Sequence, residues 1–217
     1  AVWVGHFQAG LDYSLYQNGL FRTYAYPPQF NSANLSIRSF VNRGPEKVIG
    51  SRDGLFYINE ATGIVKSFVK PVLTSDLILT ICFYEGEYYI GTYGGGMMVL
   101  NPQTLSLKYF TQGDTELFQK GHIFCVKPDN RGNLWIGTSQ GLFCYNGQTK
   151  QIKNFTSTNS QLPEGNVYEV SFDSTGKGWI ATETGMCIYD PASQSLRSNV
   201  FPEGFVHKDK VRTIYED

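Results

Sequence analysis

The chain has 217 residues, and its 18 Lys and Arg against 19 Asp and Glu give a formal net charge of -1. Without an excess of positive charge it has no field to attract nucleic acid or acidic lipid, so neither is expected as a partner. Aromatic residues make up 15% and charged residues 17%, a mixture that favours strands over exposed helices. No apolar run reaches about 18 residues and no signal-peptide pattern opens the chain, so we expect no membrane insertion of this segment.

A short apolar motif ending in a small residue occurs five times. Its copies are Trp3-Val-Gly5, Val48-Ile-Gly50, Tyr89-Ile-Gly91, Trp135-Ile-Gly137 and Trp179-Ile-Ala181, and their last residues are 45, 41, 46 and 44 positions apart. This period is typical of one blade of a β-propeller, which has four short strands.

The segments around each motif complete such a blade. An apolar strand and an Asp/Gly turn precede the motif, as in Ile123–Val126 and Asp129–Gly132. A glycine, a second apolar strand and an Asn or Asp turn follow it, as in Gly141–Tyr145 and Asn146–Thr149. We call the four predicted strands a, b, c and d, the motif being on b; strand d ends near an aromatic residue: Phe68, Phe110, Phe155 and Phe201.

The predicted fold is therefore all-β, a propeller of about five four-stranded antiparallel blades. Residues 1–217 form a single propeller domain or a propeller segment. The sequence begins on a strand b and ends on a strand a at 211–214, so four complete blades and one composite blade of the terminal strands could close a ring. Membership of a larger ring is the alternative, and both remain open.

The motif Asn133-Leu-Trp-Ile-Gly-Thr138, followed by Gly141-Leu-Phe143 and the Asn/Asp-Pro turns, resembles the two-component regulator propeller repeats. That family occurs in the sensor regions of bacterial hybrid two-component receptors. The resemblance implies a periplasmic or extracellular location in an inner-membrane receptor, detection of an oligosaccharide or similar small ligand, and contacts with neighbouring receptor domains or a second receptor copy. It places the histidine kinase in another part of the receptor.

The loops at the two ends of the predicted blades differ. Those joining a to b and c to d are short and alike, whereas the connections from d to the next a are longer and unlike one another, as at 111–122 and 156–166. Variable loops on a rigid scaffold commonly carry recognition. With the b–c loops at the same end, they predict a ligand site from amide, carboxylate and aromatic groups; its candidate residues are His6, Gln8, Arg52, Asp53, Tyr93, Gln140, Glu183 and Thr184.

The sequence predicts neither a metal site nor a cofactor. His6, His122 and His207 are isolated from one another, without zinc-ligand spacing. Cys82 and Cys125 fall on strands a, and Cys144 and Cys187 on strands c. Within a blade, strand b separates strand a from strand c, so a cysteine on a and one on c are too far apart for a disulfide. We expect four reduced, buried thiols.

Two other functions are less favoured. One is a propeller glycosidase or lyase, for which no catalytic residue is assigned. Glycoside hydrolysis would need paired carboxylates, for which Asp53 and Glu183 are the candidates. A protein-docking scaffold could use the aromatic and proline-rich segment at 24–30. The sensor interpretation is preferred because the resemblance covers essentially the whole chain.

Overall fold

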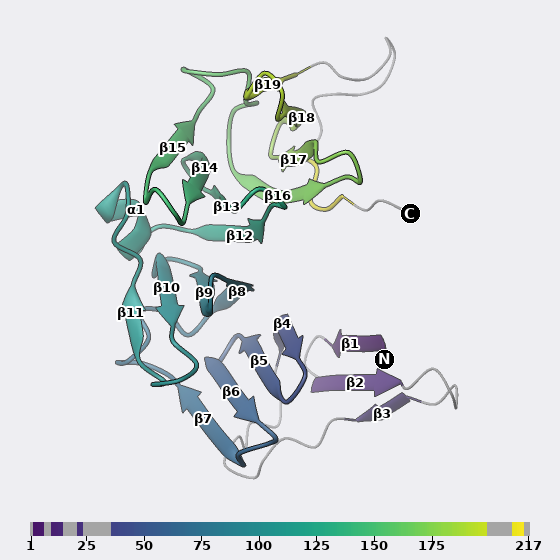
Figure 1. Ribbon diagram of the computed structural model, residues 1–217, viewed down its shortest axis with the longest axis vertical. Coiled ribbons are helices and arrows are strands. Elements are labelled where there is room, and N and C mark those ends of the chain that lie inside the picture. Colours follow the sequence, from purple (N-terminus) through teal and green to yellow (C-terminus); the bar gives the residue numbers. More distant parts are fainter. Residues whose placement is uncertain (1, 7–9, 15–20, 24–35, 199–209, 215–217) are drawn as a thin grey trace. The chain divides into compact units, whose positions relative to one another are not determined.

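The computed structural model describes residues 2–6, 10–14, 21–23, 36–198 and 210–214. Within them nearly all regular structure is β-strand, in four four-stranded antiparallel sheets and one three-stranded sheet (Figure 1). The chain divides into two compact units, 1–81 and 82–217, with the division inside strand β8. Each unit is described by itself.

Unit 1 contains the three-stranded N-terminal sheet and the first four-stranded sheet, blade 1. Both have the strand order of the sequence, with each strand antiparallel to the next. The N-terminal sheet comprises β1 (Val2–His6), β2 (Gly10–Ser14) and β3 (Phe21–Thr23); blade 1 comprises β4 (Ile37–Arg43), β5 (Glu46–Ser51), β6 (Leu55–Asn59) and β7 (Ile64–Phe68).

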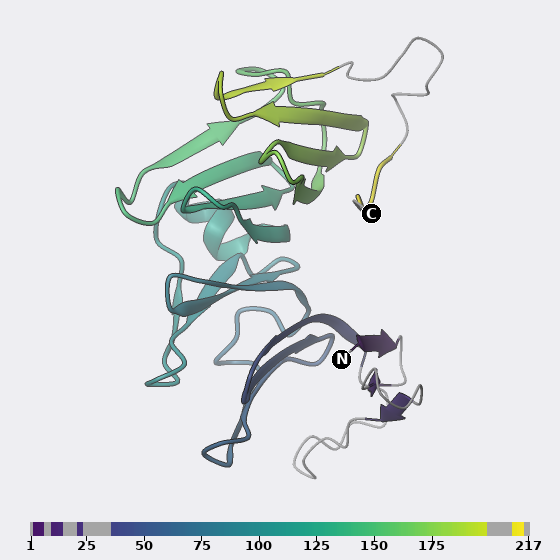
Figure 2. The ribbon, with the colours of Figure 1, turned by 45° about the vertical axis from the view of Figure 1, so that its right-hand side comes forward.

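Unit 2 contains most of blade 2 and all of blades 3 and 4, with the same strand order (Figure 2). Blade 2 comprises β8 (Ile78–Tyr84), β9 (Glu87–Thr92), β10 (Met97–Leu100) and β11 (Leu107–Tyr109). Blade 3 comprises β12 (Ile123–Pro128), β13 (Asn133–Thr138), β14 (Gly141–Asn146) and β15 (Ile152–Phe155); blade 4 comprises β16 (Val167–Phe172), β17 (Gly178–Thr182), β18 (Gly185–Asp190) and β19 (Ser195–Arg197).

The a-b-c-d organisation predicted from the repeat is confirmed in these four blades. The composite blade is represented by the N-terminal sheet, since residues 210–214 have no strand assignment. Its fourth strand stays a prediction, and Phe201 lies outside the described residues. The single-domain assignment and the closure of a ring stay predictions.

Buried apolar side chains join consecutive blades of unit 2. Trp135 of β13 is 1% exposed, and its ring lies 4.5 Å from that of Tyr189 and 5.9 Å from that of Phe155. The expectation that the tryptophan motif packs between neighbouring blades is thus confirmed for Trp135; Trp179 is half-buried. An added Cβ at Gly137 would lie 2.8 Å from the carbonyl oxygen of Val167 in blade 4, so the small residue of the motif permits close packing of sheets.

The a–b and c–d turns form the end of each blade that we call the turn end. The Asp129 carboxylate accepts hydrogen bonds from the backbone N–H groups of Arg131 and Asn133, both at 2.8 Å, and from Trp135 Nε1 at 2.9 Å. Asp173 accepts the matching bond from Trp179 Nε1 at 2.9 Å. In blades 3 and 4 the motif tryptophan is therefore tied to the aspartate of its own turn, which explains why the two residues have the same spacing in both blades.

One helix was not predicted. Helix α1 (Thr115–Lys120) lies in the connection from β11 to β12, and Asp114 caps it by accepting a hydrogen bond from the N–H of Leu117 at 3.0 Å. Leu117 and Phe118 are 1% and 0% exposed and join the core between blades 2 and 3. The variable loop at 111–122 is therefore in part a packed element of the scaffold.

Candidate functional site

The b–c and d–a loops form the opposite end of each blade, the loop end. In blades 1 to 4 the b–c loop starts from a buried hydroxyl, and the four hydroxyls donate to the carbonyl of a glycine three or four residues later at 2.8–3.1 Å. Each hydroxyl also accepts from a loop N–H group at 2.9–3.4 Å. The backbone at the candidate residues is thus fixed by the repeat while their side chains vary; the hydroxyl residues are Ser51, Thr92, Thr138 and Thr182.

The predicted site residues fall into three groups. Arg52 and Asp53 are exposed in the β5–β6 loop of unit 1. His6 ends β1, and Gln8 lies outside the described residues. The third group belongs to the loop end of unit 2: Tyr93, Gln140, Glu183 and Thr184.

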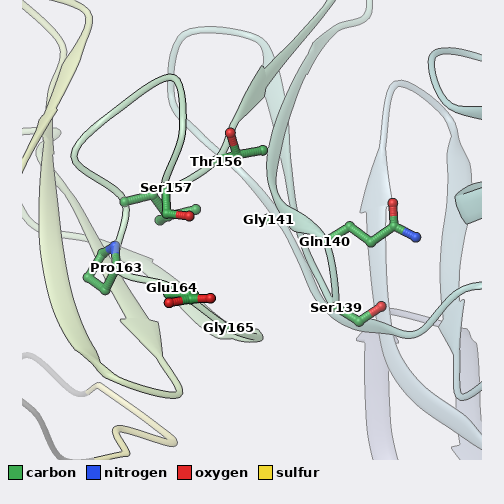
Figure 3. Close-up of a pocket in the computed structure, with 9 residues that line it drawn as sticks. Ser139, Gln140, Gly141, Thr156, Ser157, Pro163, Glu164 and Gly165 are labelled. Atoms are coloured by element: carbon green, nitrogen blue, oxygen red, sulfur yellow. The ribbon is translucent and has the colours of Figure 1, made fainter.

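A groove of about 290 Å³ lies between the β13–β14 loop and the connection from β15 to β16 (Figure 3). Hydroxyl, amide and carboxylate groups predominate in its wall. In the view of Figure 3 the amide of Gln140 extends away from Ser157 and Glu164, so these two residues supply polar groups from the opposite wall. The lining residues are Ser139, Gln140, Gly141, Thr156, Ser157, Leu162, Pro163, Glu164 and Gly165.

Hydrogen bonds and one apolar anchor hold the 156–166 wall of the groove. The Thr156 N–H donates to Asn159 Oδ1 at 2.8 Å, and the Ser160 hydroxyl donates to the carbonyl of Thr156 at 2.6 Å. Leu162 is 4% exposed in the core between blades 3 and 4. Thr184 Oγ1 donates to the carbonyl of Glu164 at 2.6 Å. The groove is therefore preformed, and Thr184 acts on it through the backbone.

Glu183 is held in a polar cluster beside the groove. Its carboxylate accepts hydrogen bonds at 2.8 Å from Lys210 Nζ and from Asn166 Nδ2. The hydrogen bond from Lys210 lowers the pKa of Glu183 and raises that of Lys210. A carboxylate with a lowered pKa suits an ion pair rather than a general acid. Of the two carboxylates considered for hydrolysis, Asp53 belongs to unit 1 and Glu183 to unit 2.

Tyr93 lies against a histidine that was not among the candidates. The Tyr93 and His122 rings are stacked, with centroids 4.0 Å apart and planes at 27°. His122 precedes β12, and its ring is 6.1 Å from that of Phe124, which lies 5.2 Å from the ring of Tyr168. Phe124 and Tyr168 were not among the predicted site residues because they lie within strands a. The signal that could have identified them is that this position of strand a varies between blades.

The cysteines are free thiols, and Cys144 is half-buried while the other three are buried. The expectation of burial is therefore corrected for Cys144, which sits at the edge of the core between blades 3 and 4. Burial raises the pKa of Cys125 to about 12, so its thiolate is disfavoured. The described ranges hold no cluster of three or more His, Cys, Asp or Glu side chains suited to a metal ion. Nor do they include a helix long and apolar enough to cross a membrane.

The family model of the two-component regulator propeller matches residues 118–140, from within α1 through β13 to the β13–β14 loop. This match confirms the resemblance predicted from the sequence. Together with the four-stranded antiparallel sheets, it shows that the fold is that of a β-propeller. A comparison with curated proteins found no match.

Solved structures resemble the chain over almost its whole length. The extracellular domain assigned to the hybrid two-component system BT3049 of B. thetaiotaomicron is 25% identical, with a TM-score of 0.74, over 99% of this chain and 29% of that one. The extracellular domain assigned to the one-component system BT4673 of the same organism is 17% identical, with a TM-score of 0.69, over 96% of this chain and 28% of that one. PorZ of the type-IX secretion system of Porphyromonas gingivalis is 14% identical, with a TM-score of 0.62, over 90% of this chain and 32% of that one. The chain thus spans about a third or less of these proteins.

Proposed function

We propose that this chain is part of the extracytoplasmic sensor propeller of a bacterial two-component receptor and that it binds an oligosaccharide at the loop end of its blades. The observation that carries the proposal is the 25% identity to an extracellular receptor domain over 99% of the chain. The proposed location is the periplasm or cell surface, with the kinase and the membrane anchor in other parts of the receptor. Signalling would pass to neighbouring receptor domains or to a second receptor copy.

The groove between 139–141 and 156–165 suits a sugar. Sugars present many hydroxyl groups, which exchange hydrogen bonds with Ser, Thr, Gln and Glu side chains. Ser157 and Glu164 are exposed at the groove, whereas Pro163 is half-buried and adds an apolar surface. Because the 156–166 wall is preformed by its own hydrogen bonds, little loop ordering opposes binding.

A thermal-shift screen against plant and host oligosaccharides tests this function. A ligand that binds the folded state raises the melting temperature by mass action, so one glycan class is expected to raise it by several degrees without product formation. A sharp transition that no sugar shifts would favour a protein-docking scaffold instead, and product formation would favour an enzyme.

A matched pair of variants tests the location of the site. Ser157→Arg places a bulky side chain at the groove, whereas Ser174→Arg makes the same change at an exposed serine of the β16–β17 turn, at the turn end. Only Ser157→Arg is expected to abolish the shift caused by the sugar. Equal loss of the shift in both variants, or in neither, would place the binding elsewhere.

A further inference from the structure

Strand a carries a β-bulge at the same repeat position in blades 1, 3 and 4. The register shifts between Ile37 and Ser39 in β4, between Ile123 and Cys125 in β12, and between Val167 and Glu169 in β16. A bulge inserts one residue and re-aims its side chain, and bulges are over-represented beside functional sites. The bulged residues are Arg38, Phe124 and Tyr168.

The bulged position varies, as does the position directly after it, within a strand that keeps its apolar residues. The residue before the bulge and the one two positions after it are apolar in all three blades, as with Ile123 and Val126 in blade 3, which are 0% and 1% exposed. The bulged residue is half-buried or exposed and changes from Arg to Phe to Tyr between blades; it is Arg212 at the corresponding place in 211–214. The scaffold therefore does not require a particular side chain there, which is typical of a position used for recognition.

In unit 2 the bulged residues belong to a continuous row of rings. We call Tyr93, His122, Phe124 and Tyr168 the aromatic row; consecutive ring centroids are 4.0, 6.1 and 5.2 Å apart. Tyr93 is 50% exposed at one end. His122 has a buried Nδ1 without a hydrogen-bond partner in the described part of the chain. A buried polar atom without a partner is destabilising, so the row is not optimised for stability alone.

The other end of the aromatic row is cationic. The Arg212 guanidinium lies 4.6 Å and Lys210 Nζ 5.0 Å from the Tyr168 ring centroid. Lys210 is neutralised by its ion pair with Glu183. Arg212 is exposed and forms no ion pair with any residue that the structure describes, so its charge remains available to a ligand.

We propose that the aromatic row and Arg212 bind an oligosaccharide that carries an anionic substituent, a carboxylate or a sulfate. The inference rests on the proposed sensor function and adds the class of sugar and a second contact surface beside the groove. The row adjoins the groove where the Ser139 N–H donates to the carbonyl of His122 at 3.2 Å. A pyranose ring would pack its apolar C–H face on Tyr93. The planar fork of Arg212 would receive two oxygens of the anion. Tyr168 is a positioning residue that holds the guanidinium by cation–π contact.

The test is calorimetric titration of the 217-residue chain with four probes: a tetragalacturonate, its fully methyl-esterified form, a sulfated galactan tetrasaccharide and the unsulfated galactan. Each pair differs mainly in charge. The anionic member of at least one pair is expected to bind about tenfold or more tightly than its neutral form, with an affinity that falls as salt rises. The pair that shows the preference identifies the anion.

Two variants with matched controls locate the contacts. Arg212→Met keeps an unbranched stem without charge and is expected to remove the anionic preference; Arg131→Met, at an exposed arginine of the turn end, is expected to leave it intact. Tyr93→Ala is expected to lower the affinity for the anionic sugar and for its neutral form alike, by about three- to tenfold. The control Tyr109→Ala, at a tyrosine 41% exposed on β11, is expected to leave both affinities unchanged. Melting curves of the four variants confirm that each is folded.

Three results would overturn the inference. Equal affinity for charged and neutral forms in both pairs would refute the anionic ligand class and leave the oligosaccharide sensor standing. If Arg212→Met retains the preference for the anionic form, Arg212 is not the residue that binds the anion. Absence of binding to all four probes removes the proposed ligand class, and if the wider sugar panel is also without effect, the sensor function fails with it.

Discussion

The two ends of the blades in unit 2 differ in what the repeat conserves: side-chain contacts at the turn end and backbone geometry at the loop end. At the turn end, Asp129 and Asp173 each receive the indole N–H of the tryptophan six residues later. At the loop end, buried threonines repeat one hydrogen-bond pattern, yet the side chains just beyond them are Tyr93, Gln140 and Thr184. Blades 3 and 4 share one side-chain contact at the turn end, whereas at the loop end a uniform backbone carries changing side chains. The turn end therefore stabilises the blade, and the loop end offers the variable surface on which the proposed ligand would bind.

The largest loss of stability is expected for Trp135→Ala. This side chain is 1% exposed and packs against Phe155 and Tyr189, so its removal leaves a cavity in the core between blades 3 and 4 and costs about 3–5 kcal/mol. Urea denaturation measures the loss. Trp179→Ala removes the equivalent, half-buried residue and is expected to cost less; a smaller loss for Trp135 than for Trp179 would contradict the packing described.

Two glycine substitutions distinguish the cost of a close contact from the cost of backbone strain alone. Gly141 has φ +119°, and an added Cβ would lie 2.5 Å from the carbonyl oxygen of Phe155, so Gly141→Ala is expected to cost at least about 2 kcal/mol. Gly132 in the β12–β13 turn has φ +78° and open space around the added atom, and Gly132→Ala is expected to cost about 1 kcal/mol. Equal losses in chemical denaturation would show that the loop end is not tightly packed at Gly141.

Acid sensitivity is expected at the turn end. Burial opposes the ionised form of Asp173, but hydrogen bonds from Thr175, Trp179 and Lys177 outweigh it and lower its pKa from 3.8 to about 2. A lowered pKa in the folded state contributes stability above pH about 4, which is lost as the pH falls towards about 2. Asp173→Asn is therefore less stable than wild type at pH 7, and the difference narrows between pH 4 and 2. Thermal melts across that range that show a constant difference would contradict this assignment.

The smallest effect is expected for the ion pair at the loop end. Lys210 and Glu183 are both partly exposed, so Lys210→Met and Glu183→Gln are each expected to change the melting temperature by no more than about 2 °C. A double-mutant cycle at low and high salt measures the coupling, which is expected to weaken with salt. A loss comparable to that of Trp135→Ala would mean that this end of the blade is structural too.

The repeat predicted the strands and turns because each is specified locally. The Asx turns illustrate this: Asn59, Asn101 and Asn146 each accept hydrogen bonds from the two backbone N–H groups two and three residues later, as their turn type requires. Helix α1 was missed because its six residues are too few to show a helical period, although Asp114 was a visible capping signal.

The candidate site was predicted less completely, because its geometry depends on contacts distant in sequence. The pairing of Glu183 with Lys210 and the support that Thr184 gives to Glu164 arise from folding, not from local pattern. Phe124 and Tyr168 were overlooked because a β-bulge cannot be read from alternation of apolar residues. Their signal was present as the varying residue of strand a.

The central claim is that ligands bind the loop end and the turn end is scaffold, and hydrogen–deuterium exchange of the chain with and without the oligosaccharide that most raises its melting temperature tests it directly. Slower exchange is expected in 93–96, 139–141 and 156–166, with no change in the turns at 129–132 and 173–177. Protection concentrated in those turns, with unchanged exchange in the loops, would contradict the account.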